Sequence, residues 1–214
     1  INFFTFTFFF IFLYKKLSTQ KVKKYFFLYG WLFGFGYFLT NLYWISISLT
    51  FDKSFKFLIP ITIILIPAFL AIFYGLVSYL FTTLKTKKVI NSFFIFSLIF
   101  SILEFIRGSL LTGFPWNLIA YSFLNQLEII SIISIIGTYG FNLFCISLFS
   151  CPALLILRES NKEVIVFISL IICLSIFYLY GLQYKKIFNS SDEITYNYKI
   201  RAIGSNISLE RFYS

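Results

Sequence analysis

The chain has 214 residues, of which 59% are hydrophobic and only 12% are charged, and its mean hydropathy is +0.89. Soluble domains carry roughly 25% charged residues, so this composition excludes a water-soluble globule. The net charge of +10 arises from basic residues that flank apolar runs. Such flanking favours signals of membrane orientation over a nucleic-acid-binding surface, and we expect no nucleic-acid partner.

The apolar runs are too long for strands and lack strict alternation with polar residues, and a bilayer requires each segment to satisfy its own backbone hydrogen bonds. We therefore predict an all-α, polytopic transmembrane helix bundle with about six spans in a domain of residues 1–186. The predicted spans are residues 2–14, 25–50, 57–84, 89–107, 126–157 and 163–182.

The chain begins inside its first apolar run, contains no Met, and that run is shorter than the roughly 20 residues of a span. We therefore expect further residues before Ile1. Basic residues concentrate in the alternate loops 15–24, 85–88 and 158–162, which predicts that these loops are cytoplasmic. Residues 108–125 and 183–214 are then predicted on the outer, periplasmic side of the membrane.

Composition changes near the end of the chain. Residues 187–197 form a predicted polar linker, and residues 198–203 alternate apolar and polar side chains as a strand does. We expect 198–214 to be the truncated start of a water-soluble domain.

Cysteine and histidine usage excludes several kinds of site. The chain has no His, and Cys145, Cys151 and Cys173 lie in apolar stretches without metal-ligand or CxxC spacing. We predict no metal site, no disulfide framework and no cofactor.

The candidate functional region lies between residues 104 and 122. Glu104 and Arg107 are three residues apart, so they share one helix face and can pair. Charges at membrane depth are costly unless they are paired or line a polar cavity, which makes the pair a candidate site. Alternatively, both residues lie shallow and Arg107 extends to the lipid head groups.

Gly113, Pro115 and Trp116 follow that pair and are expected to break the helix. Trp at the interface is commonly a simple anchor. The functional alternative is an irregular outer loop, including Tyr121, that contacts lipid head groups or acyl chains.

Two other glycine-containing stretches have ordinary structural readings. Gly30 and Gly34 form a small-xxx-small pair, which favours close helix packing in lipid. Gly137, Gly140 and Asn142 give residues 126–157 a polar notch, which is part of a substrate groove or a helix crossing.

Several blocks of the sequence resemble the apolipoprotein N-acyltransferase family, in that family's order. These are Gly34–Phe38 with Leu42–Ile45, Glu104–Gly108 with Leu111–Trp116, Gly137–Gly140, and Ile203–Ile207. The last block is similar to the strand that opens the family's nitrilase-like domain. Ser205 replaces the usual Gln there, and Phe105 and Ile106 replace a common Trp-Leu.

The resemblance implies a bacterial inner-membrane enzyme that moves an acyl chain from a phospholipid to the N-terminal amine of a diacylglyceryl-cysteine lipoprotein. A Cys thiolate attacks the lipid ester to form a thioester, which the amine resolves, with Glu as base and Lys as oxyanion support. These three residues are expected downstream of Ser214, so no catalytic residue is assigned here and this chain alone is expected to be inactive.

By the same resemblance, Trp116 and Gly113 belong to the region where lipid substrates reach the enzyme. We predict Pro115 and Tyr121 as further substrate-binding residues, and Arg107 and Glu104 as residues that recognise a head group or hold the loop. The alternatives are a transporter or channel whose path Glu104 and Arg107 line, and a noncatalytic membrane scaffold.

Overall fold

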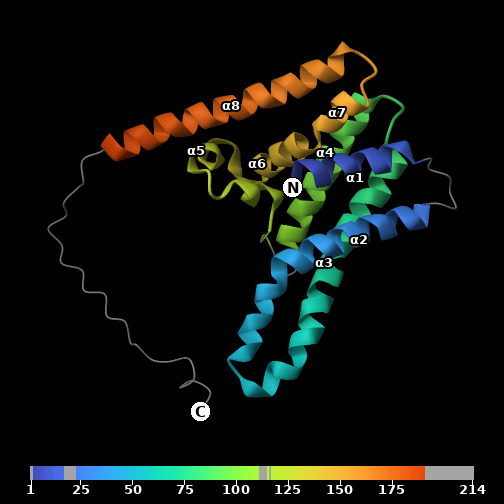
Figure 1. Cartoon of the computed structure of the whole chain (residues 1–214), viewed down its shortest axis with the longest axis vertical. Coiled ribbons are helices and arrows are strands. Elements are labelled where there is room, and N and C mark those ends of the chain that lie inside the picture. Colours follow the sequence, from blue (N-terminus) through green and yellow to red (C-terminus); the bar gives the residue numbers. More distant parts are fainter. Residues whose placement is uncertain (1, 17–22, 111–114, 116, 191–214) are drawn as a thin grey trace.

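The computed structural model describes residues 2–16, 23–110, 115 and 117–190, and this part of the chain contains helices and no strands. The elements are α1 (Asn2–Lys15), α2 (Lys23–Leu42), the 3-10 helices η2 (Tyr43–Thr50) and η3 (Lys53–Leu58), α3 (Ile59–Leu84), α4 (Val89–Ser109), η4 (Ile119–Phe123), α5 (Leu127–Ile130), α6 (Ile133–Ser150), α7 (Pro152–Ile156) and α8 (Asn161–Ser190) (Figure 1).

Within the described residues, five helical segments are long and apolar enough to cross a membrane. They are Tyr25–Thr50, Lys53–Leu84, Val89–Ser109, Ile133–Ile156 and Asn161–Ser190. Helix α1 is a shorter apolar helix. The predicted all-α membrane bundle is thus confirmed, with five of the six expected spans meeting this criterion. The predicted strand at 198–203 lies outside the described residues.

Helices α2 and α3 pack closely because α2 offers glycines at their contact. A Cβ atom at Gly30 would lie 2.2 Å from Ser78 Oγ and 2.3 Å from the Tyr74 carbonyl oxygen, and one at Gly34 would lie 2.7 Å from the Tyr74 side chain. Helices in lipid gain little from the hydrophobic effect, so close backbone approach is a main source of their association. The packing reading of this glycine pair is confirmed.

Phenylalanine rings from α1, α3 and α4 fill the centre of the bundle. Ring centroids lie 5.3 Å apart for Phe10 and Phe96, 5.4 Å for Phe81 and Phe96, and 5.4 Å for Phe6 and Phe100. Tilted and edge-on arrangements of this kind are favourable between aromatic rings. The abundant Phe residues therefore serve as core as well as lipid-facing surface.

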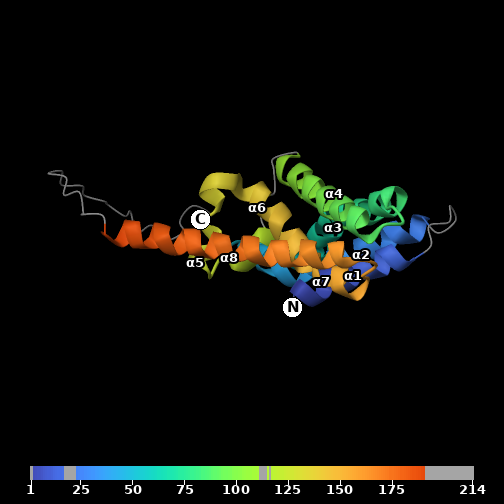
Figure 2. The ribbon, with the colours of Figure 1, turned by 90° about the horizontal axis from the view of Figure 1, so that it is seen from above.

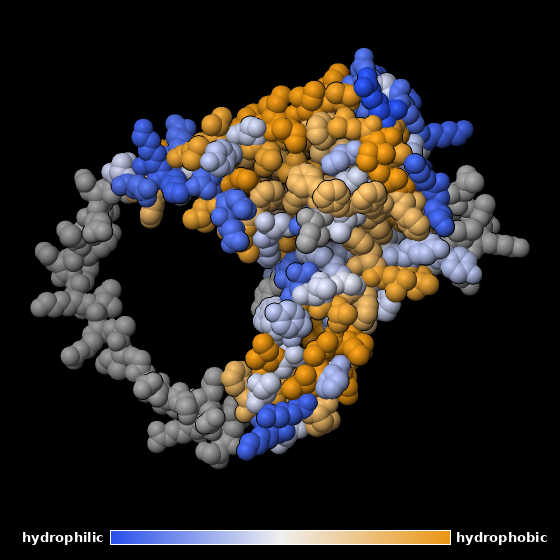
Figure 3. Space-filling model, viewed as in Figure 1, coloured by the Kyte–Doolittle hydropathy of each residue, from blue (hydrophilic) through white to orange (hydrophobic). Residues whose placement is uncertain are grey.

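The C-terminal end of α1, the start of α2, the α3–α4 turn and the α7–α8 turn all lie at the right of Figure 1. Lys85 ties two of them together, because its ammonium group donates hydrogen bonds to the carbonyl oxygens of Leu13, Tyr14 and Lys16. It thereby satisfies carbonyls that the end of α1 leaves without helical partners. In Figure 3 hydrophilic residues gather at this end, while apolar residues cover much of the helical surface between the ends.

The stretch predicted as one helix at 126–157 is divided into α5, α6 and α7. Gly137 has a φ of 71°, which breaks helical geometry inside α6 and suits glycine. The prediction of one continuous helix is therefore wrong: the stretch forms three segments with a kink, and α6 packs against η4.

Helix α8 begins with a reciprocal cap. The Ser160 backbone N–H donates to Glu163 Oε2 at 2.8 Å, and Ser160 Oγ accepts from the Lys162 N–H at 3.2 Å. The helix continues beyond the predicted span end at 182 to Ser190. Figures 1 and 2 both show it projecting past the remaining helices, with its outer part near α5.

Candidate functional site at the end of α4

Glu104 and Arg107 form a buried ion pair in the last turns of α4. Arg107 Nη2 lies 2.9 Å from Glu104 Oε2 and Nε lies 3.2 Å from Oε1, so the contact is bidentate. The side chains are 0% and 1% exposed, and the guanidinium stands over the Phe38 ring at 5.2 Å. The predicted pairing is confirmed, and the alternative in which Arg107 extends to the head groups is wrong.

The pair has further aromatic neighbours in the bundle. Tyr74 of α3 is 1% exposed and lies beside the Glu104 carboxylate. Tyr37 of α2 is within the electrostatic field of both charges. The charges on α4 are thus covered by groups from α2 and α3, which makes the pair part of the packing between helices rather than part of an open surface.

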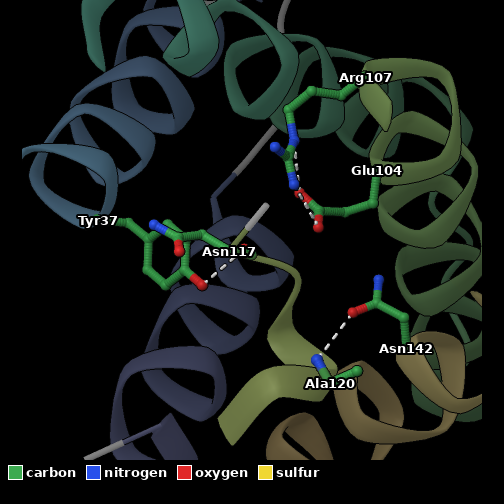
Figure 4. Close-up of polar contacts among 6 residues, drawn as sticks. All are labelled: Tyr37, Glu104, Arg107, Asn117, Ala120 and Asn142. Atoms are coloured by element: carbon green, nitrogen blue, oxygen red, sulfur yellow. Dashed lines mark hydrogen bonds and ion pairs between the residues drawn. The ribbon is translucent and has the colours of Figure 1, made fainter. Parts of the chain in front are cut away.

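A short irregular segment, residues 117–123, follows Pro115 and includes η4. Asn117 has a φ of 56°, a left-handed conformation that Asn tolerates better than most residues. The Asn117 carbonyl oxygen accepts a hydrogen bond of 3.0 Å from the Tyr37 hydroxyl. The Ala120 backbone N–H donates to Asn142 Oδ1 at 2.9 Å. Figure 4 shows these two contacts reaching the segment from different helices.

Asn142 settles one of the alternatives left open by the sequence. It is fully buried on α6, and its side chain bonds to the main chain of η4. Asn142 therefore holds η4 and does not line the cavity described next.

A cavity of about 750 Å³ lies between α1, α2 and the 117–124 segment. Its lining combines apolar side chains with hydroxyl and amide groups. The lining residues are Asn2, Thr5, Phe6, Leu32, Phe33, Gly36, Tyr37, Thr40, Asn41, Asn117, Leu118, Tyr121, Ser122 and Leu124. This volume and mixed lining fit the mainly apolar pockets with a few polar groups that bind small amphiphiles.

Tyr121 is the predicted site residue that lines this cavity. Desolvation first, and the neighbouring Tyr139 second, raise the pKa of its hydroxyl above the ordinary value, while Arg107 acts in the opposite direction. At neutral pH Tyr121 is consequently an uncharged group that can donate a hydrogen bond.

The other predicted site residues do not line the cavity or lie outside the described residues. Glu104 and Arg107 stand behind the segment and do not line the cavity. Pro115 is half-buried, near Gly108 at the end of α4. Gly113 and Trp116 lie outside the described residues.

Two residues at the site were not among the predicted ones. Tyr37 lies within a block that resembles the family, and Asn117 directly follows another, but the sequence predicted a role for neither residue. An Asn after a Pro-containing break is a signal that could have identified Asn117, whereas Tyr37 is one of several hydroxyl-bearing residues on α2 and composition does not distinguish it.

The cysteines and acidic residues suggest no separate centre. Cys145 and Cys151 are fully buried thiols without disulfide partners, and Cys173 is a free thiol on α8. Among the described residues, no group of three His, Cys, Asp or Glu side chains could hold a metal ion.

Comparison with known proteins gives a consistent match. The family model of the apolipoprotein N-acyltransferase N-terminal domain matches residues 1–151. The apolipoprotein N-acyltransferase of Rhodopseudomonas palustris is 40% identical over 137 residues, covering 63% of this chain and 25% of that protein. Its namesake from Rickettsia prowazekii is 32% identical over 179 residues, covering 83% of this chain and 35% of that protein.

The chain spans about a quarter of the length of the first curated relatives it matches. The matched region contains the ion pair, Pro115, the 117–123 segment and Asn142, so the candidate site lies within the shared domain. By this match over most of its residues, the chain belongs to the apolipoprotein N-acyltransferase family.

Proposed function

We propose that this chain is the membrane domain of an enzyme that transfers an acyl chain from a phospholipid to the N-terminal amine of a diacylglyceryl-cysteine lipoprotein. Family membership supports the activity, since the relatives are named apolipoprotein N-acyltransferases. The proposed site of the domain is the bacterial inner membrane, with residues 108–125 and 183–214 on the periplasmic side.

The observation that carries the proposal is the cavity of about 750 Å³ beside the 117–124 segment. Phe6, Leu32 and Phe33 give it apolar walls, while the Tyr121 and Thr40 hydroxyls give it hydrogen-bonding groups. Both proposed substrates are amphiphiles with acyl chains and a polar head, so a site with both kinds of lining suits them.

The chemistry itself is proposed to belong to a nitrilase-like domain after the polar linker, with its Glu, Lys and Cys downstream of Ser214. There a Cys thiolate would displace the lysophospholipid alcohol from the ester, and the lipoprotein amine would then displace the thiol from the thioester. Trp116, Gly113, Pro115 and Tyr121 are proposed to guide the lipids, with Arg107 and Glu104 supporting the loop.

The burial of Glu104 and Arg107 argues against the transporter alternative. A transport path would require these charges to face water or a translocated solute. They face one another instead, almost fully buried and away from the lining of the cavity.

The test uses the complete polypeptide that contains this chain, in membranes of cells whose own N-acyltransferase is depleted. Mass spectrometry of a reporter lipoprotein should show the mass of one added acyl chain. Trp116→Ala should lower that product at equal amounts of folded protein, whereas Phe94→Ala, a change at an exposed aromatic residue near the other end of α4, should not. Absence of the added acyl chain with the unmodified protein would refute the proposed activity.

A further inference from the structure

The 117–123 segment is fixed to the bundle through its main chain. Tyr37 of α2 donates to the Asn117 carbonyl, and Asn142 of α6 accepts from the Ala120 N–H. Each contact depends on one side-chain group, the Tyr37 hydroxyl in the first and Asn142 Oδ1 in the second. The two bonded groups are three residues apart, one before η4 and one inside it, and the 3-10 bonds of η4, such as that of 3.0 Å from the Tyr121 N–H to the Leu118 carbonyl, define the rest of the backbone locally.

The two holding residues come from different sides of the bundle. Tyr37 also lines the cavity, whereas Asn142 is fully buried behind the segment. The segment contributes Asn117, Leu118 and Tyr121 to the lining. Its position relative to α2 therefore affects the width of the cavity. The two main-chain hydrogen bonds fix the segment to α2 and α6, beside a contact of 2.6 Å from Asn2 Nδ2 to Ser122 Oγ and the burial of Leu118, Ile119 and Ala120.

The ion pair supplies a rigid support for this arrangement. Arg107 stands over Phe38, the residue after Tyr37, and the Tyr37 and Phe38 rings are 5.2 Å apart. Tyr37 also stacks on Tyr74 at 5.7 Å, and Tyr74 lies beside Glu104. Packing against Phe38 and Tyr74 thus fixes the orientation of the Tyr37 ring, and this orientation directs its hydroxyl at the Asn117 carbonyl.

We propose that Tyr37 and Asn142 are positioning residues that hold residues 117–123 in place as one wall of the amphiphile-binding cavity. This rests on the proposed function, because the wall matters only if the cavity takes a lipid substrate. Neither residue takes part in acyl transfer itself. Loss of either bond lets the wall move and weakens lipid binding without changing the reacting groups.

The first experiment measures the wall without any assay of activity. Hydrogen–deuterium exchange at the Ala120 amide should be at least tenfold faster in Asn142→Leu than in the unchanged protein, because the acceptor of that N–H is lost. Ser147→Ala is the matched control, since Ser147 Oγ bonds to the Leu143 carbonyl within the same helix. Unchanged exchange in Asn142→Leu would overturn the proposal.

The second experiment separates positioning from general stability. Tyr37→Phe is compared with Tyr14→Phe, which removes an equivalent hydroxyl-to-carbonyl bond of 2.6 Å, to Lys87, near the opposite end of the bundle. The complete enzyme is assayed with a synthetic diacylated lipopeptide in nanodiscs of phosphatidylethanolamine and phosphatidylglycerol. Tyr37→Phe should raise the KM for the lipid substrate at least fivefold and leave kcat within twofold, and Tyr14→Phe should change neither.

The outcomes are distinguishable. A fall in kcat at constant KM in Tyr37→Phe would mean a loss of folded enzyme and would overturn a positioning role. An unmodified enzyme that transfers no acyl chain would refute the proposed function, while the exchange at Ala120 would still decide whether Asn142 holds the segment.

Discussion

Removing one charge of the Glu104–Arg107 pair should destabilise the bundle strongly. The pair is bidentate, at 2.9 and 3.2 Å, and its side chains are 0% and 1% exposed. A buried ion pair that loses one partner leaves an uncompensated charge, which costs about 3–5 kcal/mol. We expect a loss of that size for Arg107→Met, which keeps much of the side-chain volume over Phe38, and a similar loss for Glu104→Gln.

The double variant Glu104→Gln/Arg107→Met separates the charge from the packing. It contains no unpaired charge, so it should be more stable than the sum of the single effects predicts, with a coupling energy of about 2 kcal/mol or more. The measurement is the free energy of unfolding in bicelles, obtained by steric trapping. Single losses below about 1 kcal/mol, or additive effects in the double variant, would show that these charges are not held in an apolar environment.

Two further predictions concern the ends of the helices. The Lys185 ammonium donates to Glu128 Oε1 at 2.7 Å and holds the pKa of that carboxyl below its ordinary value. The contact between α5 and α8 should therefore be complete above about pH 4.5 and weaken as the pH falls through the lowered pKa; spin-label distances between these helices should show this, and Glu128→Gln should abolish the pH dependence. For the orientation, single cysteines at Ser109 and Glu159, in a protein without its native cysteines, should be labelled from the outside and from the cytoplasm respectively. The opposite pattern would invert the proposed topology.

Local spacing predicted the features that depend on neighbours along one helix. Glu104 and Arg107 pair because three residues return to the same helix face, and Gly30 and Gly34 pack because both lie on one side of α2. Such relations need no knowledge of the partner helix. The resemblance to the family could be stated from the sequence for the same reason, because its motif at Leu111–Trp116 is contiguous.

Features that depend on the approach of distant segments could not be predicted. The sequence left the role of Asn142 open, because its partner, the Ala120 N–H, is 22 residues away along the chain. It gave no role to Tyr37, whose hydroxyl donates to the Asn117 carbonyl 80 residues away. The breaks that divide residues 126–157 were not predicted, because no charged residue lies at them; Gly137 marks the kink inside α6 and Pro152 marks the start of α7.

The tilt of the long, sparsely packed helix α8 should depend on the thickness of the bilayer. Its 30 residues extend about 45 Å, against roughly 30 Å of hydrocarbon. Almost none of its most apolar stretch is buried against the bundle, and a close approach is made where Gly181 meets the Glu128 backbone. A helix of excess length relieves mismatch by tilting. In a thinner membrane α8 should tilt about that contact, so lipid composition would set the position of Ser190 relative to the cavity.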